Sequence, residues 1–189
     1  MKYREMAGEK ISVLGFGCMR FPTTSKNAED IDAEKSAKML EYAIENGVNY
    51  FDTAYVYHGG KSESFIGGVL KPYRDKIHIA TKCPTWEVKC EEDFDRLLNE
   101  QLERLQTDYI DFYLMHALDK DRFKNVVEKF NLIDKLNKAK ADGKIRHIGF
   151  SFHDDVETFK KIIDANPNWE FCQIQLNYIN VKYQAGLEG

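Results

Sequence analysis

The stretch that decides the fold is residues 91–116, which read EEDFDRLLNEQLERLQTDYIDFYLMH. Its first part predicts an amphipathic helix over Glu91–Leu105, because apolar residues recur there at helical spacing, at Phe94, Leu97, Leu98, Leu102 and Leu105. Tyr109–Met115 follows as a short, mostly apolar run, which is typical of a buried strand. A helix followed at once by such a strand is the repeating unit of parallel α/β proteins.

The same alternation extends to both sides of this stretch. It predicts further strands at Ile11–Phe16, Val48–Phe51, Ile77–Ala80, His147–Phe150 and Phe171–Leu176. It predicts helices at Ala33–Asn46, at Ser62–Leu70, within Phe123–Asp142 and at Val156–Asn166. Tyr3–Lys10 predicts a short hairpin ahead of them. Six β/α units fit either an open doubly wound sheet or an incomplete eight-unit barrel, and periodicity alone does not decide between the two.

Composition excludes several classes of protein. With 189 residues, 43% of them hydrophobic, the chain can bury a sizeable core and is not intrinsically disordered. Its 27 Lys and Arg against 31 Asp and Glu give a net charge of −4, so nothing favours nucleic acid or an anionic membrane surface as a partner. The chain has no long apolar run, and Met1–Glu5 lacks the apolar stretch of a signal peptide, so we expect a cytoplasmic protein.

Cysteine usage agrees with that expectation. The four cysteines, Cys18, Cys83, Cys90 and Cys172, form no CxxC pair. We therefore expect reduced thiols and neither a zinc site nor a disulfide framework.

Polar residues stand where consecutive predicted strands end. Asp52 ends the second strand, with Tyr57 in the loop that follows, Lys82 ends the third and His116 the fourth. Each of them alone has an ordinary structural explanation, such as a turn cap, a loop aromatic, a surface charge or a core histidine. In a parallel barrel, however, the C-terminal strand ends face the active site. Together, a carboxylate, a phenol, an ammonium and an imidazole at these ends indicate a proton-donor site.

The chemistry of such a set is specific. A phenol is a poor acid near neutrality, and an ammonium beside it stabilises the phenolate left after proton donation. Lys82 can supply that ammonium for Tyr57, and Asp52 can keep the ammonium charged. An imidazole such as His116 can orient a carbonyl oxygen or share its proton. Since no protein side chain donates hydride, carbonyl reduction at this site would require a nicotinamide cofactor.

These residues lie in an ordered set of motifs. The motifs are Gly15–Arg20 (GFGCMR), Asn49–Ala54 (NYFDTA), Tyr57 with Ser62–Glu63, Ala80–Lys82 (ATK), Asp108–His116 (DYIDFYLMH), Gly143–Ser151 (GKIRHIGFS) and Gln173–Asn177 (QIQLN). In this order the sequence resembles the aldo-keto reductase family from about residue 3 to its end. The resemblance implies an α/β fold, the (β/α)8 TIM barrel of aldo-keto reductase type, here incomplete with about six β/α units. It also implies reduction of a small aldehyde or ketone by NADPH, with NADH as the alternative cofactor.

The resemblance also assigns roles to residues. It places the family's catalytic tetrad on Asp52, Tyr57, Lys82 and His116, with Tyr57 as the proton donor. It implies that Ser151 and Gln173 hydrogen-bond the nicotinamide carboxamide and that the turn at Gly17, Cys18 and Met19 lies beside the cofactor. Trp86, just after the third strand, resembles a wall of the substrate pocket, and an ordinary loop aromatic is an equally good interpretation. No metal ion is implied.

Two features depart from the family pattern. Phe152 follows Ser151 where the family commonly has Asn. The stretch Gly149–Asp154 resembles a bacterial branch whose longer members carry a C-terminal iron-sulfur segment, and this chain has no cysteine cluster for an iron-sulfur cluster. The larger departure is length, because a complete barrel takes about 250 residues. We therefore expect residues 1–189 to be one barrel domain truncated before strands seven and eight, with unclosed sheet edges open to self-association.

The residue pattern is also compatible with two other classes of function, to different degrees. A non-catalytic or regulatory protein that keeps the reductase fold is favoured by the truncation, whereas the intact tetrad argues against it. A metal-dependent hydrolase using Asp52, His116 and His147 is disfavoured, because no HxH pair is present and Lys82 would be repelled by a nearby divalent ion.

Overall fold

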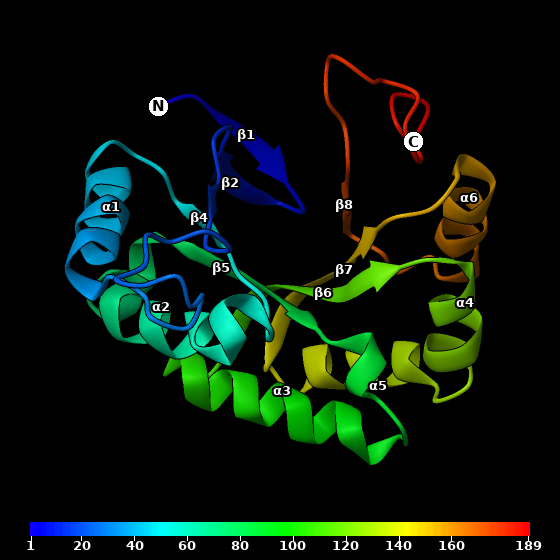
Figure 1. Ribbon diagram of the computed structural model, residues 1–189. Coiled ribbons are helices and arrows are strands. Elements are labelled where there is room, and N and C mark those ends of the chain that lie inside the picture. The colour runs from blue at the N-terminus through cyan, green and yellow to red at the C-terminus, as the bar shows by residue number, and fades with distance from the viewer. The chain divides into compact units, whose positions relative to one another are not determined.

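A computed structural model describes residues 1–189 (Figure 1). Its main sheet has six strands: β3 (Phe16–Gly17), β4 (Tyr50–Asp52), β5 (His78–Cys83), β6 (Ile110–Leu118), β7 (Ile145–Phe152) and β8 (Phe171–Ile174). The strands neighbour one another in chain order, and the pairs β3–β4, β4–β5 and β7–β8 are parallel. A doubly wound sheet would reverse its order at a switch point. The fold is therefore an incomplete (β/α)8 barrel, as the resemblance implied.

Helices connect the successive strands. They are α1 (Ala33–Glu45), α2 (Ser62–Leu70), α3 (Glu92–Leu105), α5 (Leu132–Ala141) and α6 (Val156–Ala165). Short turns of helix accompany them: η1 (Tyr57–Gly60), η2 (Lys71–Lys76), η3 (Thr85–Glu87), α4 (Lys120–Arg122) and the π-helical η4 (Phe123–Glu128). The helix expected within Phe123–Asp142 is thus confined to α5, because Asn131 adopts a left-handed conformation (φ 50°) that separates it from η4.

The chain divides into two compact units. The first comprises Met1–Thr81 and Leu98–Phe112, and the second comprises Lys82–Leu97 and Tyr113–Gly189. In the first unit α1 packs against α2, and in the second α5 packs along β7 (Figure 1).

The strand expected at Ile11–Phe16 is wrong in extent. Residues up to Ser12 belong to an antiparallel hairpin of β1 (Tyr3–Met6) and β2 (Glu9–Ser12), and only Phe16–Gly17 joins the main sheet. The cause is a pair of reciprocal hydrogen bonds between backbone and side chain. The Ser12 amide donates to Asn49 Oδ1 (2.7 Å), and the Asn49 amide donates to Ser12 Oγ (3.1 Å). This reciprocal pair holds Ser12 to the start of the β4 segment, so the chain bends before it reaches β3.

Buried ionic groups hold the first unit together. The Asp111 carboxylate, whose side chain is 1% exposed, accepts from Arg74 (2.6 Å) and from the Ile79 amide (2.9 Å). Burial opposes its ionisation, yet His78, Arg74 and the Ile79 amide together lower the pKa of Asp111. A second buried carboxylate, Glu63 of α2, accepts hydrogen bonds from Thr81 of β5 and from Gln101 and Arg104 of α3. These contacts fix β5 and α2, which flank the segment carrying Asp52 and Tyr57.

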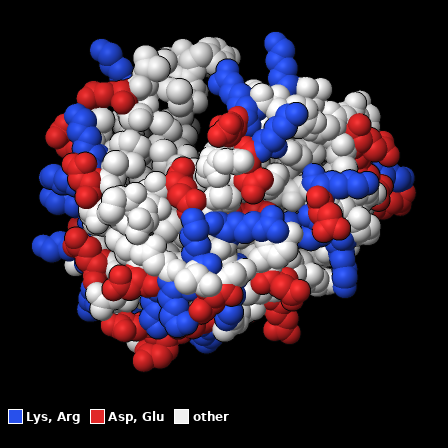
Figure 2. Space-filling view, turned by 180° about the vertical axis from the view of Figure 1, so that it is seen from behind, with Lys and Arg blue, Asp and Glu red and all other residues white.

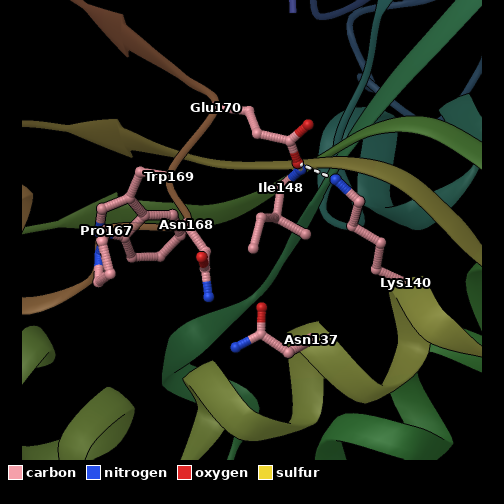
Figure 3. Close-up of a pocket in the computed structure, with 7 residues that line it drawn as sticks. All are labelled: Asn137, Lys140, Ile148, Pro167, Asn168, Trp169 and Glu170. Atoms are coloured by element: carbon pink, nitrogen blue, oxygen red, sulfur yellow. Dashed lines mark hydrogen bonds and ion pairs between the residues drawn. The ribbon is translucent and has the colours of Figure 1, made fainter.

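A cavity of about 470 Å³ lies in the second unit near the start of β8 (Figure 3). Beside it, the Glu170 carboxylate accepts from Lys140 (2.6 Å), His147 (2.8 Å) and the Ile148 amide (3.1 Å). Burial opposes ionisation here too, and these three donors nevertheless lower the pKa of Glu170. The cluster ties the loop before β8 to α5 and β7, and none of the residues predicted for the active site lines the cavity.

The surface carries both signs of charge. On the face shown in Figure 2, Lys and Arg side chains are interspersed with Asp and Glu. No helix is both long enough and apolar enough to cross a membrane.

Candidate active site

In the first unit, Asp52 is the last residue of β4 and lies in register with Gly17 of β3 and Ala80 of β5. The Cys18 amide donates to the Asp52 carbonyl (2.8 Å), and the Thr53 amide donates to the Ala80 carbonyl (2.8 Å). These backbone bonds extend the sheet pairing just beyond the strand. They bring half-buried Asp52 together with the turn at Gly17 and Cys18.

Tyr57 opens the short helix η1 and is half-buried. Its amide donates to the Ala54 carbonyl (3.1 Å). His58, Gly59 and Gly60 follow with φ values of 54°, 63° and 89°, so three consecutive left-handed residues turn the chain sharply into α2. Gly59 and Gly60 allow this turn, because only glycine adopts positive φ without steric strain.

The turn at Gly17, Cys18 and Met19 has one buried and two exposed members. Cys18 is fully buried, whereas the side chain of Met19 is 52% exposed. A Cβ atom at Gly17 would meet no other atom within 4 Å, so there is open space beside the backbone there.

In the second unit, the structure brings together Lys82, Trp86 and His116. Lys82 lies in β5 and is only 2% exposed. Trp86, in η3, is half-buried, and its ring centroid lies 5.0 Å from that of His116 in β6. Thr85 Oγ1 donates to the His116 carbonyl (3.0 Å), which fixes η3 to this strand. The Trp86 ring therefore lies beside the imidazole of His116.

Electrostatics keep the His116 imidazole neutral. Burial first, and then the positive charges of Lys82, His153 and Arg122, lower its pKa to about 3. A neutral imidazole carries one N–H and one lone pair, so it can donate to a carbonyl oxygen without itself giving up a full proton. The sequence pointed to His116, but the positive charges of Arg122 and His153 near it were not foreseen.

We expect His116 to remain uncharged well below neutral pH. In an unfolded chain an imidazole takes up a proton near pH 6.5. With a folded pKa of about 3, the unfolded state binds more protons between these values, so stability falls as the pH drops from about 6.5 toward about 3. NMR titration of the imidazole resonances, assigned by their loss in His116→Gln, checks this. A His116 midpoint in the usual imidazole range would contradict it.

Ser151 and Gln173 lie side by side on β7 and β8. They are register partners in this parallel pair, and Gln173 is exposed. Ser151 is 4% exposed, and its Oγ accepts from the Ala117 amide (2.7 Å). A hydroxyl and a primary amide offer both donors and acceptors, which suits recognition of a carboxamide.

The departure at Phe152 has a structural explanation. Its ring is 1% exposed and packs edge-on against Phe159 of α6 at 5.3 Å between centroids, with Phe150 beside it. Phe152 therefore belongs to the apolar layer between β7 and α6. It supplies no polar contact, so Ser151 and Gln173 remain the polar side chains predicted for the carboxamide on these two strands.

Comparisons with known proteins agree with this fold and residue pattern. The Aldo/keto reductase family model matches residues 13–187, and the chain belongs to this family. Probable aldo-keto reductase 1 of Glycine max is 32% identical over 153 residues, which cover 76% of this chain and 42% of the relative. An aldo-keto reductase from Bacillus halodurans in its holo form matches with a TM-score of 0.74 at 28% identity, covering 93% of this chain and 57% of that one.

A third match is an aldo/keto reductase from Klebsiella pneumoniae solved in complex with NADP and acetate. It has a TM-score of 0.70 and 25% identity, and it covers 89% of this chain and 55% of its own. The chain spans about half the length of the curated relatives it matches.

Proposed function

We propose that this chain carries the catalytic residues of an NADPH-dependent reductase that converts small aldehydes or ketones to alcohols. The proposal depends on one observation: Asp52, Lys82 and His116 lie toward the C-terminal ends of β4, β5 and β6, with Tyr57 just after β4, in a member of the aldo/keto reductase family. The Klebsiella relative in complex with NADP supports the choice of cofactor. NADH is the alternative.

In this proposal Tyr57 donates a proton to the carbonyl oxygen of the substrate. The Lys82 ammonium stabilises the phenolate that remains, and Asp52 keeps that ammonium charged. His116, held neutral by its surroundings, donates a hydrogen bond that orients the carbonyl oxygen, and Trp86 borders the substrate. Tyr57 would thus place its proton on the oxygen end of the carbonyl bond, opposite the carbon that is reduced.

The residues present fit a nicotinamide. The open space at Gly17 suits the ring, and the hydroxyl of Ser151 with the amide of Gln173 suits the carboxamide. When bound, the cofactor supplies the hydride. Ser151 and Gln173 orient the carboxamide, and the turn at Gly17, Cys18 and Met19 borders the ring.

An assay of NADPH oxidation in the presence of aliphatic and aromatic aldehydes and ketones tests the function. We expect oxidation that depends on the carbonyl compound and yields the matching alcohol in equal amount. Cofactor is supplied at roughly millimolar concentration, because weak binding must not hide the activity. Binding of NADPH without carbonyl-dependent oxidation would instead identify a non-catalytic binding protein.

A further inference from the structure

The turn that borders the proposed nicotinamide position is held at both polar backbone groups of Cys18. The Cys18 amide donates to the Asp52 carbonyl (2.8 Å). The Cys18 carbonyl accepts from the Ser62 hydroxyl (3.1 Å), which comes from the first residue of α2. The turn is therefore fixed to the end of β4 by backbone pairing and to α2 by the Ser62 side chain.

The Ser62 hydroxyl is oriented by a second hydroxyl. Ser62 Oγ lies 2.9 Å from Thr53 Oγ1, and both side chains are fully buried. A serine has only one hydroxyl proton, and Ser62 gives it to Cys18, so Thr53 is the donor in the contact between the two hydroxyls. The hydrogen bonds thus run in one direction, from Thr53 through Ser62 to Cys18. Thr53 directly follows Asp52 in the chain.

A separate anchor holds the chain just after this turn. The Phe21 amide donates to His58 Nε2 (3.0 Å), and His58 Nδ1 lies 2.6 Å from the Ala28 carbonyl. An amide only donates and a carbonyl only accepts, so His58 is neutral with its proton on Nδ1. His58 directly follows Tyr57. Because this anchor is independent of Ser62, loss of the Ser62 hydroxyl should loosen the turn without releasing the whole segment.

We propose that Ser62 is a positioning residue that sets the distance between the nicotinamide ring and Tyr57, a role that rests on the proposed function. Ser62 acts through the Cys18 carbonyl and does not touch the substrate. The segment from Asp52 to Ser62 carries the proton donor, and the same segment holds the turn that borders the ring. The two reacting partners therefore share one rigid support. Catalysis is sensitive to such support, because misplacement by about 1 Å can cost on the order of 100-fold in rate.

The test compares Ser62→Ala with Ser36→Ala in the full chain. Ser36 is a matched control: it is also fully buried in a helix, and its hydroxyl has no hydrogen-bond partner. Both variants remove one buried oxygen atom, so the change in volume is the same. At one fixed, roughly millimolar NADPH concentration, we expect Ser62→Ala to lower the apparent kcat by about 10-fold or more, with little change in KM for the carbonyl compound. Ser36→Ala should leave kcat unchanged, and Ser62→Cys, which keeps a weak donor, should fall between the two.

A second readout needs no cofactor. Amide hydrogen exchange at Cys18 should become about 10-fold faster in Ser62→Ala than in Ser36→Ala, because the turn opens more often. A lower unfolding temperature with unchanged kcat and unchanged Cys18 exchange would show a merely structural role and overturn the proposal. Failure of the proposed function would give a different result, because the wild-type chain itself would then show no carbonyl-dependent oxidation of NADPH. That result would overturn the positioning role of Ser62 as well.

Discussion

Replacement of Tyr57 by phenylalanine is expected to lower kcat for carbonyl reduction by about 100-fold or more. The variant keeps the ring and loses only the hydroxyl, so the substrate oxygen would have to take its proton from a poorer donor. Cofactor binding should hardly change, because the phenol acts on the carbonyl oxygen. An interaction made only in the transition state lowers kcat and kcat/KM together.

Tyr55→Phe is the matched control for this experiment. Tyr55 is a neighbour of Tyr57 in sequence, and its hydroxyl donates to Glu100 Oε2 (3.0 Å). The control therefore also loses one tyrosine hydroxyl and one hydrogen bond, without loss of the proposed proton donor. Steady-state kinetics at one fixed, roughly millimolar NADPH concentration compare the two variants with the wild type. Near wild-type kcat in Tyr57→Phe would rule out Tyr57 as the proton donor.

The second large effect concerns cofactor affinity of the 189-residue polypeptide. Its main sheet has six strands, whereas the family resemblance places the contacts to the pyrophosphate and the adenosine phosphate after strands seven and eight. Charge-assisted hydrogen bonds of that kind contribute about 1.5 to 3 kcal/mol each. The absence of two or three of them would move a micromolar Kd toward the millimolar range or beyond, since about 1.4 kcal/mol corresponds to tenfold. Residues 1–189 alone should therefore bind NADPH too weakly for turnover at ordinary cofactor levels.

A fluorescence titration with NADPH measures this affinity, and reduced nicotinamide mononucleotide serves as the control ligand. The mononucleotide lacks the adenosine phosphate end of NADPH. If residues 1–189 make no contacts to that end, the mononucleotide should bind about as tightly as NADPH does. Saturation by NADPH in the low micromolar range, with much weaker binding of the mononucleotide, would contradict the prediction. It would mean that residues 1–189, or an oligomer of them, already provide the phosphate contacts.

The succession of helices and strands could be predicted from apolar periodicity, whereas the strand order of the main sheet followed only from the family resemblance. β6 and α3, for example, appear within a residue or a few of their expected bounds. The extent of the first strand could not be predicted, because it depends on the hydrogen bonds between Ser12 and Asn49, which are distant in sequence. The break at Asn131 was equally hidden, since a left-handed residue leaves the apolar periodicity around it intact.

In the candidate site, too, the sequence indicated some features, whereas others depend on contacts that form only on folding. The residue types at strand ends indicated Asp52, Lys82 and His116, and the motif Ser62–Glu63 was visible as part of the resemblance. What Ser62 does was not visible, because its partners Thr53 and Cys18 meet it only in the folded chain. Likewise, the low pKa of His116 depends on burial and on charges brought near by folding.

The most direct test of the proposed chemistry is isotope transfer from the cofactor. The chain is incubated with a carbonyl compound and NADPH that carries deuterium at the transferable nicotinamide position, at roughly millimolar concentration. We expect the alcohol to gain one deuterium on the former carbonyl carbon, at a rate that falls about 100-fold or more in Tyr57→Phe. Cofactor that remains bound but unoxidised, with no deuterium on the carbon of any alcohol formed, would contradict hydride transfer by this protein.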